Sequence, residues 1–570
     1  YEISACLVGS EMCIRDRNTI CRLLLCEVLT NINTDNIIKL LLILLIFQGD
    51  KMEFLCDTNY ILFPTSDNAQ NKRLCFYIDN ELVYDIVLKL DNDSPDYKFP
   101  VNMRRFKGNK VKIISNPMMN ICFEKADKIK FDYDGKYRPS VHFTASKGWI
   151  NDPNGLVYYG GRYLMYFQHN PVAATWGNMH WGGAVSDDLI HWQEIGDVLF
   201  PDKDGTMFSG SAIIDKKNLT ELQRGNEPAI LYFYTSAGNT SETSKGKPFT
   251  QCLAYSNDGG KTLIKYDKNS IIKNIIKENR DPKVIYCEPD DSYIMVLFLD
   301  SHSFAILKSK NLLDWSQIQE IALPDDGECP DFYPLCADGD SKNIKWIFSA
   351  ASDRYYIGSF DGNKFIIETE QKRLNFGNAS YAAQSWSDIP NGRRVRTAFA
   401  SFVIPNNPFG SCLNIPQNMT IKTINGEPYL SALPVKEFET LYKNRDVKTD
   451  VVINSDMPFI KSIQSKACDI SVSASAENSF SLELFGLKIS FNADDKILQC
   501  LDKSAPLKSV NGTVDLRIIF DTLYTEIFAD FGTVFMGMTY IADSNLNSLR
   551  IESKNATIQN IRVSELNSIH

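Results

Sequence analysis

A polar turn motif recurs four times in the middle of the chain, and it constrains the fold more than any other feature of the sequence. Each copy ends a strand-like run, and the copies are 186–192, 256–260, 309–315 and 359–365. Successive copies begin 70, 53 and 50 residues apart. Periods of this size, each holding about four short strands, are typical of β-propeller blades, which bury their sheet faces against neighbouring blades. The sequence therefore predicts a β-propeller over residues 138–432.

The regions on either side of the repeat also have the patterns of β-strands. The chain contains 33 Phe and 25 Tyr, and its short apolar runs are separated by Gly, Asn and Asp rather than by helical repeats. Apolar and polar residues alternate over 52–134, which predicts a small N-terminal β-sandwich-like domain. Alternation resumes beyond the repeat, so residues 434–570 are expected to form a C-terminal β-sandwich. The predicted fold class is all-β.

The front of the chain differs in character from the rest and leaves two interpretations open. The apolar run 37–47 has about the length of a signal-peptide core, but no small-residue cleavage site follows it. Residues 48–52 back-translate instead to a purine-rich ribosome-binding sequence ahead of a start codon at Met52. We therefore expect residues 1–51 to be a non-native or untranslated leader and the protein to be a bacterial-type cytoplasmic enzyme. A real signal segment at 37–47 would instead mean secretion.

Charge and composition argue against several classes of protein. The net charge is −10 and no polybasic stripe is present, which argues against nucleic-acid binding. The fourteen cysteines form no CxxC pair and the six histidines form no ligand pair, so no metal site, cofactor or disulfide framework is expected. The apolar run 37–47 is too short to cross a bilayer, and no membrane partner is expected.

Three acidic residues, Asp152, Asp281 and Glu328, each precede a strand-like run of the repeat. Corresponding positions in a radial repeat face one axis, so these carboxylates would meet at one mouth of the channel. Repulsion and burial there would spread their pKa values, and sugar hydrolysis needs one carboxyl ionised while another is protonated. Taken singly, each is also typical of a structural turn, because 152–155 is a favourable turn sequence and Asp281 could simply pair with Arg280.

In this order and spacing the three acids resemble the motifs of glycoside hydrolase family 32, which contains invertases, inulinases and levanases. The matching motifs are Trp149–Gly155, Arg280–Pro282 and Glu328–Asp331. Further matching segments are 166–171, 176–182, 208–212 and 381–386. The resemblance covers residues 138–436 and, more faintly, the C-terminal region. It implies a propeller of five blades followed by a β-sandwich.

The resemblance also implies roles for individual residues in a retaining double displacement. Asp152 would attack the anomeric carbon of a terminal fructosyl unit, while Glu328 would protonate the leaving oxygen and then activate water. Asp281 would accept hydrogen bonds from fructose hydroxyls, and Arg280 would hold the array. Neutral polar groups and aromatic faces would supply the other substrate contacts, namely Asn151, Gln168, Ser209, Trp176 and Phe208.

The sequence departs from the family pattern at three places, which puts the rim of the pocket in question. Gly183 stands where a His often follows Trp-Gly, Ala-Phe-Ala at 398–400 replaces Gly-Trp-Met, and Pro416-Gln417 replaces Pro-Arg. Because the missing tryptophan commonly lines the sugar site, Phe399 is expected to substitute for it only in part.

The favoured function is an exo-acting fructan β-fructosidase of levanase type, because segments 206–210 and 385–390 look more like levanases than invertases. The expected partner is thus a fructan or sucrose-like carbohydrate. A sucrose-hydrolysing invertase, a non-catalytic carbohydrate-binding propeller and an arabinan-cleaving hydrolase stay open as alternatives. The retained carboxylates argue against binding alone, and the segment 149–155 favours fructose over arabinan.

Overall fold

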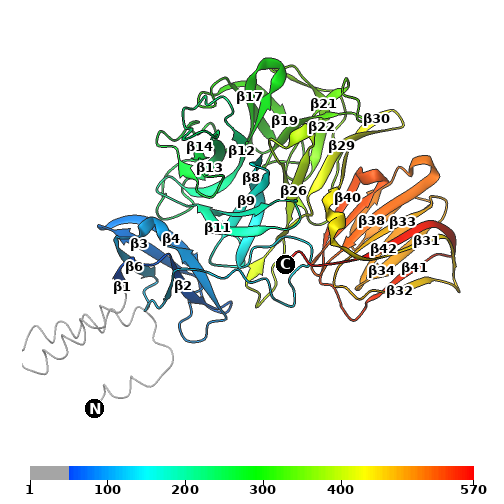
Figure 1. Cartoon of the computed structure of the whole chain (residues 1–570), viewed down its shortest axis with the longest axis horizontal. Helices are drawn as coiled ribbons and strands as arrows, with labels where there is room; N and C mark the ends of the chain where they lie inside the picture. The colour runs from blue at the N-terminus through cyan, green and yellow to red at the C-terminus, as the bar shows by residue number, and fades with distance from the viewer. Residues whose placement is uncertain (1–50) are drawn as a thin grey trace, which may run out of the picture. The chain divides into compact units, whose positions relative to one another are not determined.

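The computed structural model describes residues 51–570 (Figure 1). These residues divide into two compact units, one of residues 51–98 and 103–127, the other of residues 99–102 and 128–570. The expected leader, residues 1–51, lies outside the described part except for Lys51, which begins the first strand. Ten cysteines lie within the described residues, and no disulfide bond joins any two of them.

The first strands of the chain form a four-stranded sheet, β1-β6-β3-β4, and a three-stranded sheet, β5-β2-β7. Their bounds are β1 Lys51–Leu55, β2 Tyr60–Thr65, β3 Lys72–Ile78, β4 Glu81–Leu88, β5 Tyr97–Asn102, η1 Arg104–Phe106, β6 Lys110–Asn116 and β7 Glu124–Ala126. Alternate residues of β2 and β6 are buried, among them Ile61, Phe63, Val111 and Ile113. This alternation is the half-buried strand pattern that the sequence shows over the same region.

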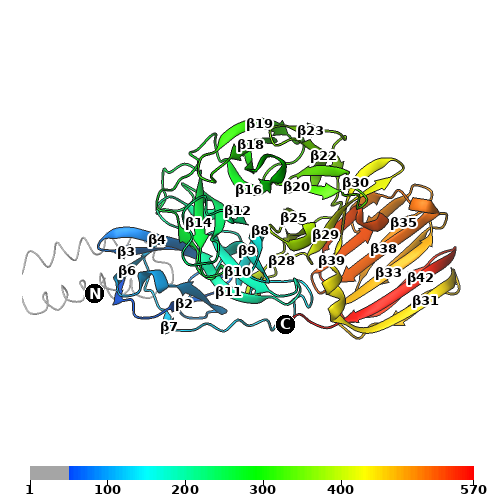
Figure 2. The same cartoon turned by 45° about the horizontal axis from the view of Figure 1, so that its top comes forward.

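Five antiparallel sheets follow, and they are the blades of a propeller. In Figure 2 their first strands, β8, β12, β16, β20 and β25, surround a common centre. The first blade consists of β8 Gly148–Tyr159, β9 Arg162–Asn170, β10 His180–Ser186 and β11 Gln193–Leu199. The second blade consists of β12 Thr206–Ile214, β13 Ile230–Ala237, β14 Thr250–Ser256 and β15 Ile264–Lys265. The third blade consists of β16 Arg280–Cys287, β17 Ser292–Asp300, β18 Ser303–Ser309 and β19 Ser316–Ala322, with η2 Glu288–Asp290. The last two are β20 Asp331–Cys336, β21 Ile344–Ser349, β22 Arg354–Phe360 and β23 Phe365–Ile367 with β24 Lys372–Arg373; and β25 Tyr381–Ser385, β26 Val395–Ala400, β29 Gln417–Ile424 and β30 Glu427–Pro434 with η3 Pro390–Gly392 and β28 Cys412–Leu413. The five-bladed propeller is confirmed.

The recurring turn motif connects the third strand of a blade to its fourth strand. Its four copies begin at or near the ends of β10, β14, β18 and β22. In the first copy, Asp188 Oδ1 accepts the backbone N–H of His191 at 2.8 Å, and the indole of Trp192 donates to the Leu189 carbonyl at 3.0 Å. In the third copy, Trp315 donates in the same way to the Leu312 carbonyl at 3.1 Å. The repeat is therefore a turn that closes on its own backbone, which explains its polar and aromatic residues.

The last blade is joined to the first blade by two contacts from its own loops. The short strand β27, Phe409–Gly410, pairs in parallel with the start of β8, at Gly148 and Trp149. Farther along β8, the backbone N–H of Tyr158 donates to the Ser387 carbonyl at 3.0 Å. These pairings close the ring between residues that are more than two hundred positions apart in sequence.

The cores lie between neighbouring blades. Tyr166 and Trp181 of the first blade pack with Tyr232 of the second blade, and the hydroxyls of Tyr166 and Tyr232 lie 2.9 Å apart. Gly155 lies in β8 against this cluster, since a Cβ atom there would come within 2.9 Å of Tyr166 Cδ2. The sequence 152–155 is therefore not a turn but a bulged part of strand β8, where the pairing with β9 shifts register.

Two six-stranded sheets form the C-terminal sandwich, in the orders β31-β42-β33-β38-β39-β40 and β32-β41-β34-β35-β36-β37. Their bounds are β31 Tyr442–Asn454, β32 Phe459–Ser462, β33 Cys468–Ser475, β34 Phe480–Leu484, β35 Leu487–Asn492, β36 Ile497–Cys500, β37 Lys503–Pro506, β38 Thr513–Phe520, β39 Tyr524–Ala529, β40 Val534–Thr539, β41 Ser548–Glu552 and β42 Asn555–Leu566, with η4 Lys436–Leu441, η5 Val510–Gly512 and η6 Asp530–Gly532. Inward side chains of both sheets, such as Ile470, Leu482 and Ile551, share one apolar core.

Candidate active site

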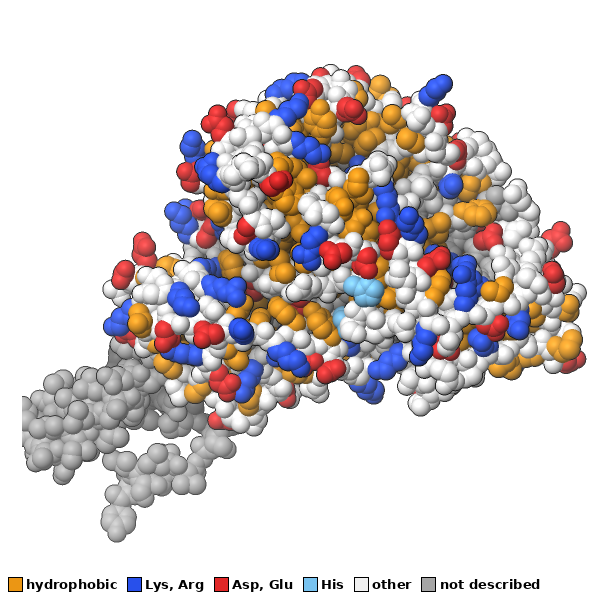
Figure 3. Space-filling view, viewed as in Figure 1, with side chains coloured by type: hydrophobic (Ala, Val, Ile, Leu, Met, Phe, Trp, Pro, Cys, Tyr) orange, Lys and Arg blue, Asp and Glu red, His pale blue; other side chains and the backbone are white. Residues whose placement is uncertain are grey.

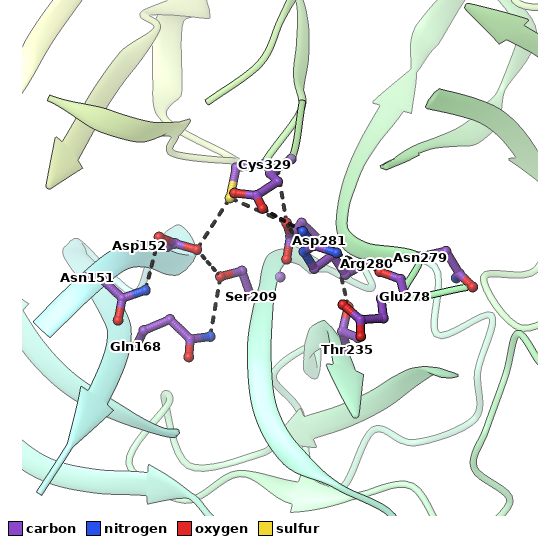
Figure 4. A network of polar contacts seen from close by, with 12 residues as sticks. Asn151, Asp152, Gln168, Ser209, Thr235, Glu278, Asn279, Arg280, Asp281 and Cys329 are labelled. Atoms are coloured by element: carbon purple, nitrogen blue, oxygen red, sulfur yellow. Dashed lines mark hydrogen bonds and ion pairs between the residues drawn. The ribbon is translucent and has the colours of Figure 1, made fainter. Parts of the chain in front are cut away.

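A cavity of about 570 Å³ opens where the first strands of the blades meet. All nine residues that the sequence marked as site residues line it, namely Asn151, Asp152, Gln168, Trp176, Phe208, Ser209, Arg280, Asp281 and Glu328. They come from different blades, and the labelled groups in Figure 4 come from β8, β9, β12, β13 and β16 and from the segments just before β16 and β20. The radial repeat therefore brings together side chains that are far apart in the sequence, such as Asp152 and Cys329, which are 177 positions apart.

Asp152 lies on β8 and is oriented by two neutral donors. Its Oδ2 accepts a hydrogen bond from Ser209 Oγ at 2.5 Å, and its Oδ1 accepts one from Asn151 Nδ2 at 3.1 Å. The indole of Trp149 donates to the Asn151 side-chain oxygen at 3.0 Å, so the amide presents its nitrogen to the carboxylate. Burial raises the pKa of Asp152, while the hydrogen bonds from Ser209 and Asn151 oppose this shift.

Asp281 begins β16 beside Arg280 and is 6% exposed. Its Oδ2 accepts the backbone N–H of Cys329 at 3.1 Å and lies 3.8 Å from Arg280 Nε. Burial raises the pKa of Asp281 to about 7, because the favourable charge of Arg280 only partly offsets desolvation and the nearby negative charge of Asp152. The ionisation of this carboxyl is therefore expected to change near neutral pH.

Glu328 lies just before β20, and two groups hold its carboxylate from opposite oxygens. Arg280 Nη2 donates to Oε1 at 2.5 Å, and the Tyr381 hydroxyl donates to Oε2 at 2.9 Å. Burial lowers the pKa of Arg280, but the charges of Asp281 and Glu328 outweigh this effect and raise it overall. The pKa of Tyr381 is raised, by burial first and then by the charge of Glu328, so this phenol stays a donor.

The backbone is left-handed at three residues of this network. The φ angles are +64° at Asp281, +59° at Glu328 and +39° at Cys329. A non-glycine residue in this region costs about 1–3 kcal/mol and persists only where the surroundings enforce it. This conformation brings the Cys329 sulfur within 3.3 Å of Asp152 Oδ2 and 3.4 Å of Asp281 Oδ2. Strain at two of the three acidic residues and at the neighbouring cysteine is typical of a functional site.

Much of the remaining cavity wall consists of neutral polar and aromatic side chains. Gln168 donates to Ser209 at 3.3 Å and so extends the hydrogen-bonded chain that ends at Asp152. The ring of Phe208 packs edge to face against Trp176 at 6.2 Å and against Phe249 at 5.5 Å. Trp176 is 60% exposed, which leaves its indole available to a ligand. Carboxylates, neutral donors and exposed aromatic faces are the groups that bind sugars.

Several lining residues were not marked from the sequence as site residues. They include Trp149, Thr240, Phe249, Glu278, Tyr381 and Phe399. Tyr381 begins β25, the first strand of the fifth blade. Asp152 and Asp281 lie on the first strands of their own blades, β8 and β16, and this equivalent position could have identified Tyr381 as a site residue. Phe399 packs edge to face on Tyr381 at 6.0 Å.

The three positions that depart from the family pattern differ in whether they reach the cavity. Gly183 does not line the cavity; it lies in β10, where a Cβ atom would come within 2.9 Å of Tyr166 Cδ1. Ala398 and Ala400 are buried beside Phe399, which alone of the three reaches the cavity. Gln417 is buried as well and accepts a hydrogen bond from Arg396 at 3.1 Å. Of the replaced positions, only Phe399 therefore lines this cavity.

Within residues 51–570, no group of three or more His, Cys, Asp or Glu side chains is arranged to hold a metal ion. No helix among these residues has the length and apolar character needed to cross a membrane. Figure 3 shows basic and acidic side chains interspersed over the visible face.

The fold and the site together define a class of enzyme, the glycoside hydrolases, in which paired carboxylates at the mouth of a pocket cleave a sugar linkage. The family model described as "Glycosyl hydrolases family 32 N-terminal domain" matches residues 142–432 of this chain. The chain belongs to glycoside hydrolase family 32.

Comparisons with individual proteins agree with this assignment. The levanase of Bacillus subtilis is 32% identical over 481 residues, which cover 75% of this chain and 70% of that protein. The fructan beta-fructosidase of Streptococcus mutans is 29% identical over 462 residues, 70% of this chain and 31% of that protein. Among solved structures, the exo-inulinase of Aspergillus awamori superimposes with a TM-score of 0.69 at 24% identity, over 77% of this chain and 100% of that chain. The fructofuranosidase of Schwanniomyces occidentalis gives 0.69 at 25% identity over the same shares.

Proposed function

We propose that this protein is an exo-acting β-fructosidase that releases terminal fructosyl units from fructans of the levan type. The observation that carries the proposal is the convergence of Asp152, Asp281 and Glu328 in one cavity. Similarity to the levanase of Bacillus subtilis, at 32% identity, supports the substrate class.

The proposed reaction is a double displacement with retention. Asp152 attacks the anomeric carbon and forms a fructosyl ester while Glu328 donates a proton to the leaving oxygen. Glu328 then takes a proton from water, which attacks the ester and frees fructose. Ser209 and Asn151 favour the ionised form of Asp152 that attack requires, because both donate to its oxygens.

Asp281 is assigned to substrate binding. Its carboxylate is held by the backbone N–H of Cys329 and the charge of Arg280, which fixes its position beside the other two acids. Hydrogen bonds from sugar hydroxyls to this carboxylate strengthen as positive charge develops on the ring, so they favour the oxocarbenium-like transition state.

We infer that single fructose units are released. The three acids lie in a cavity that Trp176 and Phe208 also line, and a cavity of about 570 Å³ suits the terminal unit of a chain. The same cavity fits the fructosyl half of sucrose, and cleavage of sucrose is therefore the second candidate. Assays of purified protein on levan, inulin and sucrose, with product analysis, separate these substrates. Early release of longer oligosaccharides would contradict the exo mode.

The assigned roles predict different behaviour for two variants. Asp152→Ala should abolish turnover of every substrate, because no other group can form the ester. Glu328→Ala should still react with a fructoside whose leaving group needs no protonation, and azide should restore its turnover by attacking the ester in place of activated water. Asp187→Ala, which removes an exposed acid paired with Arg162 in the first blade, is the matched control. Near-normal activity of either site variant on levan and sucrose would refute the assignment.

A further inference from the structure

Asp281 lies in a bulge of strand β16, where the regular pairing with β17 is interrupted. The pairing matches Arg280 and Lys283 to partners on β17 but skips the two residues between them. Asp281, the first of these, has a φ angle of +64°, and Pro282, the second, has no N–H to donate. Groups outside the β16–β17 ladder must therefore satisfy the backbone of this segment.

The neighbouring second blade supplies these groups as two buried hydroxyls. Thr235 of β13 accepts a hydrogen bond from the Asp281 N–H at 2.9 Å (Figure 4). Ser211 of β12 donates to the Pro282 carbonyl at 2.9 Å and accepts a hydrogen bond from the Val284 N–H at 2.9 Å. Both hydroxyl-bearing side chains are completely buried. The left-handed backbone at Asp281 is therefore held by contacts with another blade.

Gln251, which faces Thr235 across the pairing of β13 with β14, fixes the orientation of the threonine hydroxyl. The Thr235 hydroxyl donates its single proton to Gln251 Oε1 at 2.7 Å, so a lone pair of its oxygen faces the Asp281 N–H. The nitrogen of the same amide, Gln251 Nε2, donates to the Asn279 carbonyl at 3.0 Å. Thr235 and Gln251 thus hold the backbone on both sides of Arg280.

Holding residues 279–281 also fixes the groups that surround the acids of the site. Asp281 carries one of the three carboxylates, and Arg280 donates to a second one, Glu328, at 2.5 Å. Thr235 and Gln251 do not line the catalytic cavity, and both are completely buried. Any effect of these two side chains on the reaction therefore passes through Asp281 and Arg280.

We propose that Thr235 and Gln251 are positioning residues, which hold the Asp281 carboxylate and the Arg280 guanidinium in the geometry that the reaction needs. This role rests on the proposed function and extends it to two residues outside the cavity. Asp281 is assigned to hydrogen bonds that strengthen in the transition state. Displacement of its carboxylate should therefore lower kcat more than it changes KM.

The test removes the hydroxyl of Thr235 without changing the size of the side chain. Thr235→Val should lower kcat on levan and sucrose roughly 10-fold or more, because it leaves a buried N–H without a partner. Thr235→Ser keeps the hydroxyl and should retain most of the rate. Gln251→Met removes both amide contacts and should lower kcat in the same way, which keeps the test open if Thr235→Val does not fold. Thr220→Val is the matched control, because Thr220 is buried between β12 and β13 and donates to Asp215 Oδ2 at 2.7 Å, away from the cavity.

The pH dependence of kcat/KM separates positioning from a merely structural role. The charged and titratable groups that face the Asp281 carboxyl are Arg280, Asp152, Glu328 and Cys329. Arg280 and the Cys329 N–H lower the pKa of Asp281, so a carboxylate displaced from them should have a higher pKa. The acid limb of the profile should therefore move to higher pH in Thr235→Val and stay in place in Thr235→Ser and Thr220→Val.

Two outcomes would overturn the positioning role. One is a Thr235→Val protein with a lower Tm but the native kcat and the native acid limb. The other is a crystal structure of Thr235→Val in which the Asp281 carboxylate has not moved. If the native protein cleaves no fructoside, the proposed function fails, and the crystal structures alone decide. Displacement of Asp281 in Thr235→Val but not in Thr235→Ser would then still support the positioning role.

Discussion

Replacing His142 by glutamine is expected to destabilise the protein below neutral pH and to cost less as the pH approaches 9. His142 is completely buried between the propeller and the C-terminal sandwich. Its Nδ1 lies 2.9 Å from Asp521 Oδ2, and its Nε2 lies 3.7 Å from Glu526 Oε1. Burial favours the neutral ring, but the two carboxylates outweigh it and raise the pKa of His142 to about 9.

The sign and the size of the effect follow from this pKa. In the unfolded chain the histidine pKa is about 6.5. A raised pKa in the folded state means that the stabilisation is fully present below about pH 6.5 and is lost as the pH rises through about 9. Each pKa unit corresponds to about 1.4 kcal/mol, so the charged ring contributes about 3 kcal/mol. At roughly 1 °C per kcal/mol for a protein of this size, the Tm difference between the native protein and the His142→Gln variant should change by about 3 °C.

The assay is a series of thermal melts of both proteins between pH 6 and pH 9. His191→Gln is the control, because His191 is exposed and pairs only with Asp188 three residues before it. That control should show no comparable change with pH. If the difference between the native protein and His142→Gln is the same at pH 6 and pH 9, the imidazole is not charged in the fold and the argument fails.

Two further variants test residues whose importance emerged from the structure. Tyr381→Phe removes the 2.9 Å hydrogen bond to Glu328. Because a charge-assisted hydrogen bond contributes about 1.5–3 kcal/mol, this variant should lower kcat/KM by roughly 10–100-fold while the Tm changes little. An unchanged kcat/KM would show that Arg280 alone positions the acid. Gly183→His restores the residue that often stands at this position in the family, but its side chain would meet Tyr166 and Ile195. It should therefore lower stability by about 1–3 kcal/mol, measured by denaturant unfolding, and leave KM for sucrose unaltered; a changed KM with normal stability would place Gly183 back in the pocket.

The sequence was informative wherever a short segment carries its own physical signature. The turns after Ser186, Ser256 and Ser309 contain Asx-type hydrogen bonding that polar residues make locally, so their spacing revealed the blades. The convergence of Asp152, Asp281 and Glu328 followed because equivalent positions of a radial repeat face one axis.

Features that depend on neighbours distant in sequence could not be predicted in this way. The segment 152–155 has the composition of a turn, yet packing of Gly155 against Tyr166 makes it part of a strand. The role of Tyr381 depends on an oxygen of Glu328, 53 residues earlier in the chain. The left-handed backbone at Glu328 has no local signal, because glutamate is not among the non-glycine residues enriched in that conformation.

Closure of the ring by β27 has a consequence for synthesis of the chain. The start of β8 has no partner along this edge until residues 409 and 410 have been made, so the first blade waits for the last one. During that interval an apolar strand carries unpaired backbone groups, which is the condition under which β-proteins associate with one another. Contacts of such long sequence separation also slow folding, because the chain entropy is lost before the pairing is gained. Yield of folded enzyme in a host should therefore depend on the rate of translation and on chaperone supply more than on the stability of any single blade.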